Sequence, residues 1–203
     1  MNARKFLLDD PARSQGSDNP HTRAKIEDAL LDMMAEGGAL THDRVAERAG
    51  VSRRTVYRYF PDQEALRTAA WARVGPPGGI PRTLDELFGR IGARFANFDG
   101  KAAAMTVVMA SAEGRAIRNV MKPERVESFR AMLAQETAAL PEPDRTWAIA
   151  AIQFVGSGLA WREMRDQWDM TGPEAATACR WIAEVLLDDL KRRGGKPLSE
   201  GPA

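Results

Sequence analysis

Arginine and tyrosine side chains are concentrated in one short stretch of the chain. Between positions 44 and 58 there are five arginines and a single acidic residue, Glu47, so this segment carries a net charge of +4, whereas the whole chain carries +1. Guanidinium groups pair with phosphates and with the edge of guanine, and tyrosine hydroxyls donate to phosphate oxygens. A helical hairpin with a solvated basic face is the plainer alternative. The local excess of positive charge favours binding of double-stranded DNA.

The same stretch predicts two short helices joined by a tight turn. Thr41 is a good N-cap for the first helix, and Gly50 suits the left-handed conformation that ends it. Ser52 can cap a second helix from about Arg53 to Phe60, in which Val56 and Phe60, one turn apart, face the core. These features define a helix-turn-helix, in which the N-terminal residues of the second helix meet base edges in the major groove.

The pattern assigns different contacts to the side chains of this motif. Arginines at the start of the second helix suit bidentate pairing with guanine, and Thr55 offers a methyl group and a hydroxyl. Tyr57 and Tyr59 have the reach to hold phosphates. The residues expected to contact DNA are Thr41, Arg53, Arg54, Thr55, Tyr57, Arg58, Tyr59 and Gln63.

This segment resembles the tetracycline-repressor (TetR) family of bacterial regulators over roughly positions 22–74. The resemblance is carried by Val45-Ala46, Ala49-Gly50-Val51-Ser52, Thr55-Val56-Tyr57-Arg58-Tyr59-Phe60 and Glu64-Ala65-Leu66. It implies a homodimeric all-α protein with an N-terminal DNA-binding domain and a divergent C-terminal domain for an inducer and the dimer contact. In one respect the chain departs from the family, which usually has a lysine where Gln63 stands. Glutamine can donate a hydrogen bond to a phosphate but releases no counterion.

Composition and motifs argue against several other classes of protein. The single cysteine, Cys179, excludes an internal disulfide, and two histidines make a metal site improbable. The glycines between positions 75 and 79 are interrupted by prolines and follow no strand, so they are not a phosphate-binding loop. We therefore expect no enzyme activity, no cofactor and no metal. Neither a signal peptide nor a membrane-spanning run is apparent, which predicts a cytoplasmic protein.

Apolar residues recur at helical spacing along the chain, which predicts an all-α fold. We expect an N-terminal three-helix helix-turn-helix DNA-binding domain over 20–74 and a C-terminal helical domain for ligand binding and dimerisation over 83–193. The breaker Gly75-Pro76-Pro77-Gly78-Gly79-Ile80-Pro81 separates them. Residues 1–19 and 194–203 are expected to be disordered tails.

Two long helices, from about Pro143 to Trp168 and from about Pro173 to Arg193, are expected to close the chain. The first is apolar over an arc that needs cover on two sides, which favours a four-helix interface between two subunits. An inducer could lie among apolar side chains of this domain, with Thr106, Glu113, Gln153 and Ser157 as possible polar partners. The candidate ligand-binding residues are Phe95, Met105, Met109, Phe129, Trp147, Phe154 and Trp161.

The sequence thus predicts a homodimeric transcriptional repressor that binds a palindromic operator and is released by a small, apolar effector. Its partners would be double-stranded DNA, a second copy of the chain and that effector, with no membrane. Two alternatives stay open. The protein could bind DNA without an inducer, or it could be a helical small-molecule-binding protein with weakened DNA contacts.

Overall fold

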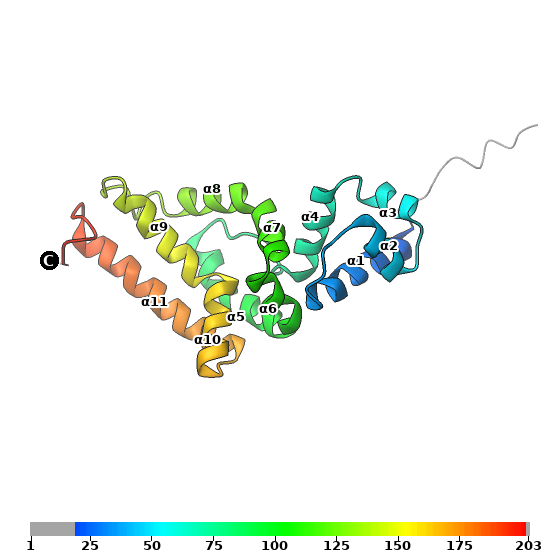
Figure 1. Cartoon of the computed structure of the whole chain (residues 1–203). Coiled ribbons are helices and arrows are strands. Elements are labelled where there is room, and N and C mark those ends of the chain that lie inside the picture. The colour runs from blue at the N-terminus through cyan, green and yellow to red at the C-terminus, as the bar shows by residue number, and fades with distance from the viewer. Residues whose placement is uncertain (1–18, 202–203) are drawn as a thin grey trace, which may run out of the picture.

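The computed structural model describes residues 19–201, so the expected tail over 1–19 lies, except for Asn19, outside the described residues (Figure 1). Within this range the chain is all-helical and has no strand. No helix in this range is long and apolar enough to span a bilayer. The helices are α1 (Pro20–Ala35), α2 (His42–Ala49), α3 (Arg53–Tyr59), α4 (Gln63–Val74), α5 (Leu84–Asp99), α6 (Ala102–Ala110), α7 (Ala112–Val120), α8 (Lys122–Met132), α9 (Asp144–Val155), α10 (Gly158–Trp168) and α11 (Gly172–Arg193).

Side-chain caps determine where α2, α3 and α4 begin. Thr41 accepts a hydrogen bond from the amide of Arg44, Ser52 from that of Thr55, and Asp62 from that of Ala65. Gly50 ends α2 with φ of 63°, the left-handed conformation that the sequence predicts there. The helix-turn-helix therefore follows from local sequence.

One of the two buried apolar clusters found among residues 19–201 runs through both predicted domains. It joins Ile26 and Val56 near the N-terminus to Phe95, Trp161 and Cys179 farther along the chain. Helix α1 packs against α6, and α4 packs against α7, so contacts between the domains are extensive. The breaker at positions 75–81 bends the chain without separating two independent cores.

The C-terminal helices pack most closely where α5 crosses α11. A Cβ atom added to Gly172, at the start of α11, would lie 2.5 Å from the backbone of Phe95, so this crossing requires glycine. The carboxylate of Asp99 accepts hydrogen bonds from the backbone amide of Gly172 at 2.5 Å and from the indole of Trp161 at 2.9 Å. One acidic side chain therefore fixes the relation of α5, α10 and α11.

The expected long helix from Pro143 to Trp168 is in fact two helices. Helix α9 ends at Val155, and the Ser157 hydroxyl caps α10 by accepting from the amides of Leu159 and Ala160. The prediction was wrong because a residue that caps a new helix lies inside an unbroken apolar pattern. The break turns Trp161 into the core, where it is fully buried. A second break, at Ser111, separates α6 from α7, a helix that the sequence analysis did not predict.

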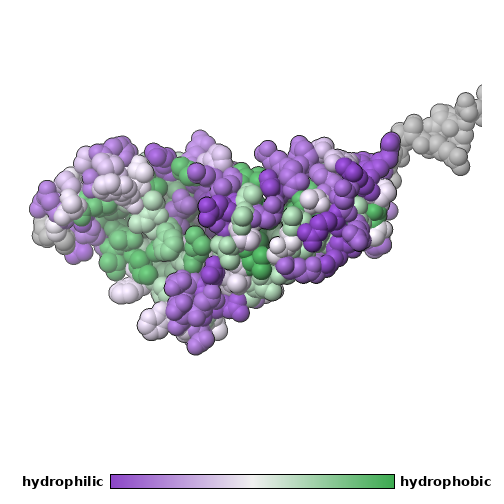
Figure 2. All heavy atoms as spheres, viewed as in Figure 1, coloured by the Kyte–Doolittle hydropathy of each residue, from purple (hydrophilic) through white to green (hydrophobic). Residues whose placement is uncertain are grey.

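Helices α9 and α11 carry an exposed apolar surface, which we call the α9/α11 face: Trp147, Phe154, Trp181 and Val185. Trp147 is 56% exposed, Phe154 51% and Trp181 67%. Hydrophobic side chains gather over these two helices in the left half of Figure 2. Large apolar side chains that remain exposed together usually mark a surface that another molecule covers.

Residues 194–201, within the segment expected to be a disordered tail, form several hydrogen bonds with the rest of the chain. Arg193 donates hydrogen bonds to the carbonyls of Lys196, Pro197 and Glu200, and it pairs with Asp189 at 2.6 Å. The amide of Leu198 donates to Asp144. The composition of the segment suggested a free tail, because hydrogen bonds of this kind cannot be recognised from composition.

Candidate functional site

Helices α2 and α3 form the predicted helix-turn-helix at the end of the molecule opposite the C-terminus (Figure 1). Val56 and Phe60 turn inward and are buried, whereas Arg53, Arg54, Tyr57 and Arg58 are exposed along α3. This is the division of faces that a helix needs if it is to enter a major groove.

The basic charge of this face is partly neutralised by acids that are near in space. Arg53 pairs with Asp43 at 3.0 Å, and Arg48 pairs with Glu36 at 2.5 Å. A hydrogen bond to Tyr57, followed by the field of Asp43, raises the pKa of Arg53 above its usual value. The net charge of +4 counted between positions 44 and 58 is therefore larger than the charge that is available to interact with DNA.

Of the five arginines between positions 44 and 58, Arg44, Arg54 and Arg58 have no acidic partner among residues 19–201, and Arg44 is bonded to the carbonyl of Ala39. Arg54 is exposed and forms neither an ion pair nor a side-chain hydrogen bond there. Arg58 lies over the ring of Tyr59, with its guanidinium carbon 5.0 Å from the ring centroid. Arg54 is thus the side chain best prepared for a base edge, because binding DNA would break no existing contact.

Tyr57 is held in place by a residue that the sequence analysis did not single out. Its ring stacks on the imidazole of His42, with centroids 3.9 Å apart and planes inclined by 5°. His42 is buried, and its Nε2 lies 2.8 Å from the carbonyl oxygen of Phe60, which can only accept. The role of His42 could have been suspected from the sequence, because it is a polar residue at the first position of α2 and that position faces the second helix of the motif.

Other expected DNA contacts are engaged inside the protein. The Tyr59 hydroxyl donates to the carbonyl of Asn19 at 3.3 Å and accepts from its amide at 2.9 Å. Gln63 donates its side-chain amide to the carbonyl of Leu40. Thr55 lies 2.7 Å from the Ser52 hydroxyl, and Thr41 caps α2. Tyr59 and Gln63 could reach a phosphate only if these bonds were exchanged or shared.

The fold and this surface define a helix-turn-helix DNA-binding protein. Residues 26–70 match the family described as bacterial regulatory proteins, tetR family. This segment therefore carries the DNA-binding domain of that family, which confirms the resemblance and the all-helical fold class predicted from the sequence and supports a DNA-binding transcriptional regulator. Searches among curated proteins and among solved structures give no match to the chain.

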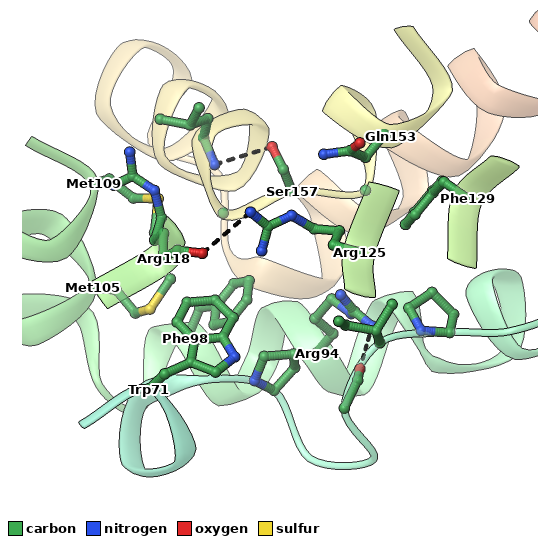
Figure 3. A pocket seen from close by; sticks show the side chains of 17 residues that line it. Trp71, Arg94, Phe98, Met105, Met109, Arg118, Arg125, Phe129, Gln153 and Ser157 are labelled. Carbon is green, nitrogen blue, oxygen red and sulfur yellow. Dashed lines mark hydrogen bonds between the residues drawn. The ribbon is translucent and has the colours of Figure 1, made fainter. Parts of the chain in front are cut away.

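A cavity lies between the α4–α5 connection and the helices of the C-terminal half (Figure 3). Its volume is about 130 Å³. Trp71 of α4 forms one wall, which brings a residue of the DNA-binding domain to the cavity. The other lining residues are Pro76, Gly79, Ile80, Pro81, Arg94, Phe98, Met105, Met109, Arg118, Arg125, Phe129, Gln153, Gly156, Ser157, Gly158 and Leu159.

The structure places the expected ligand-binding residues in three different environments. Met105, Met109 and Phe129 line the cavity. Phe95 and Trp161 are fully buried in the core and do not line it.

Trp147 and Phe154 belong to the exposed α9/α11 face and do not line the cavity either. A helical apolar stripe cannot distinguish a core wall, a cavity wall and a subunit surface, which explains this division. Of the expected polar partners, Gln153 and Ser157 line the cavity, whereas Glu113 pairs with Arg67 and Thr106 lies elsewhere.

Three arginines that line the cavity, Arg94, Arg118 and Arg125, were not predicted from the sequence as ligand-binding residues. None of them has an acidic residue three or four positions away in either direction, but the exposed Arg54 and Arg115 share this feature, so it does not by itself single out a cavity. Arginines on the outer faces of helices commonly have such an acidic neighbour, as in the pairs Arg162–Asp166 and Arg180–Glu184.

Proposed function

We propose that the protein is a homodimeric transcriptional repressor that binds a palindromic operator and releases it when a small molecule enters the cavity. The observation that carries this proposal is the position of Trp71, which belongs to α4 of the DNA-binding domain and also forms a wall of the cavity. A ligand in contact with Trp71 would act directly on the helix that follows the reading helix.

A second contact links the same helix to the cavity region. Arg67 of α4 and Glu113 of α7 form a two-point ion pair, with distances of 2.9 and 3.3 Å. Both side chains are less than one-third exposed. Helix α7 also carries Arg118, a lining residue, so a shift of α7 would be passed on to α4. A ligand that prefers one arrangement of these helices would thereby change the affinity for DNA.

The α9/α11 face supports a dimer. A second copy that presents the same face across a two-fold axis would bury Trp147, Phe154, Trp181 and Val185 of both subunits. This is the four-helix interface expected from the sequence, with α9 in place of the longer helix. Two reading heads about one helical turn of DNA apart, ~34 Å, would then read a palindrome.

The cavity favours this function over a DNA-binding protein without an inducer, and the free guanidinium of Arg54 favours it over a protein that has lost DNA binding. Selection of bound duplexes from a random pool is the most direct test. We expect a two-fold symmetric consensus with half-sites about one helical turn apart. Recovery of no consensus, or of a single half-site bound by a monomer, would contradict the proposal.

A further inference from the structure

The cavity carries a concentration of positive charge that its apolar surroundings do not explain. Arg94 comes from α5, Arg118 from α7 and Arg125 from α8. None of the residues that line the cavity is acidic. No ion pair within residues 19–201 involves any of the three arginines. Three partly buried cations therefore face one space without a counter-charge.

Backbone carbonyls accept hydrogen bonds from only some of the N–H groups of these guanidiniums. Arg94 donates to the carbonyl of Gly79 at 3.0 Å, and Arg125 donates to that of Arg118 at 3.3 Å. Arg118 donates in turn to the carbonyl of Val108. Each guanidinium has five N–H groups, so donors remain for another acceptor. The carbonyls orient the arginines without neutralising them.

Burial is the main reason that the charged form of these arginines is disfavoured, and for Arg118 neighbouring cations add to it. Burial lowers the pKa of Arg94 to about 10, with a further contribution from Arg90. Burial lowers the pKa of Arg118 as well, followed by the fields of Arg125 and Arg115, and burial alone lowers that of Arg125. Such a site stabilises an anion, because a negative charge offsets both the desolvation and the repulsion.

The remaining lining residues indicate what kind of anion fits. In Figure 3 the guanidinium of Arg125 reaches into the middle of the cavity, near Arg118, with Gln153 and Ser157 on the side opposite Arg94. Met105, Met109 and Phe98 supply apolar surface. The volume of about 130 Å³ is close to that of protein cavities that hold a single aromatic ring.

We propose that the effector is a small organic anion, whose carboxylate or phosphate is held by Arg118 and Arg125 within the field of Arg94 and whose apolar part lies against Met105 and Met109. This inference rests on the proposed function, since it names the chemistry of the molecule that the cavity takes. It replaces the apolar effector expected from the sequence.

The test compares three probes of nearly equal shape on the full chain at constant ionic strength. Benzoate and phenyl phosphate carry the two candidate anionic groups, and benzamide is the neutral counterpart. Binding is followed by calorimetry and by tryptophan fluorescence, to which Trp71 contributes. We expect at least one anion to bind roughly tenfold or more tightly than benzamide, the scale of a charge-assisted hydrogen bond. The stronger of the two anions distinguishes a carboxylate from a phosphate ligand.

Three variants identify the groups responsible. Arg118→Gln and Arg125→Gln should each weaken the anion roughly tenfold or more and leave benzamide unchanged. Arg130→Gln, an exposed arginine on α8 like Arg125, is the matched control and should bind like the parent chain. Thermal melting of each variant shows that it is folded.

The outcomes separate this inference from the proposed function. If neither anion binds up to its solubility limit, or if benzamide binds as well as both anions, the anionic effector is overturned while repression and dimerisation stand. If an anion binds through Arg118 and Arg125 but leaves the affinity for the selected duplex unchanged, the anion site stands and release by an effector fails.

Discussion

The imidazole of His42 and the phenol of Tyr57 lie face to face, with ring centroids 3.9 Å apart. His42 is itself fixed by its contact with the carbonyl of Phe60. The stack thus holds an exposed tyrosine of the reading helix against a buried residue of the preceding helix. An immobilised side chain loses less conformational entropy when it meets a ligand, so the stack would preorganise Tyr57 for the phosphate contact expected of it.

Removal of the Tyr57 hydroxyl should weaken DNA binding without changing its sequence preference. Tyr57→Phe keeps the ring stacked on His42, so the melting temperature should stay the same, while the loss of one hydrogen bond should cost about 0.5–1.5 kcal/mol for every duplex. Fluorescence anisotropy with the selected operator and several of its variants measures this. A loss confined to particular base pairs would rule out the phosphate role.

Arg54 should provide sequence discrimination, because it has no partner within the described residues. Arg54→Ala should cost about 1–3 kcal/mol on the selected operator and relax the preference at one base pair of each half-site. Arg192→Ala, at the far end of α11, is the control and should bind the operator normally. Equal weakening on all duplexes would show instead that Arg54 contacts the phosphate backbone.

A charge in the α9/α11 face should separate the subunits. Trp181→Glu would place a carboxylate inside the proposed interface, where its desolvation opposes association. Light scattering after size-exclusion chromatography should then give the mass of one chain, with helical content retained by circular dichroism. Arg115→Glu introduces the same residue on α7 and should leave the dimer intact. A dimer that persists in the Trp181 variant would place the interface elsewhere.

Cys179 should be chemically inert in the folded protein. Its side chain is fully buried, and burial raises the pKa of the thiol to about 11. At pH 8 only roughly a thousandth of the thiol would be ionised, and the thiolate is the reactive form. Iodoacetamide followed by mass spectrometry should therefore leave Cys179 unmodified in buffer and modify it in urea. Equally rapid alkylation in both conditions would mean that the α5–α11 packing opens readily.

The features that sequence predicted well depend on neighbours along the chain. The caps at Thr41 and Ser52 and the left-handed Gly50 are local, and the structure has all three as predicted. The features that were not predicted from the sequence depend on residues that are distant along the chain. Tyr59 is engaged by Asn19, 40 positions earlier, which no local pattern encodes.

The same limit applies to the cavity. Met105, Trp147 and Trp161 belong to similar apolar stripes, yet they line a cavity, an outer surface and the core respectively. Which of these a stripe becomes depends on the break between α9 and α10 and on the helices that pack around it. Tertiary packing therefore determines which apolar residues line the cavity, and this could not be predicted from the sequence.

The continuous core has a consequence for how the protein unfolds. Since buried residues from Ile26 to Cys179 form one cluster, the reading head and the C-terminal helices should melt in a single cooperative transition. Residues 20–74 expressed alone would expose the surfaces that α6 and α7 cover, and they should be only marginally folded. A mutation deep in the C-terminal half would then reduce the amount of protein able to occupy an operator, even where it touches neither DNA nor effector.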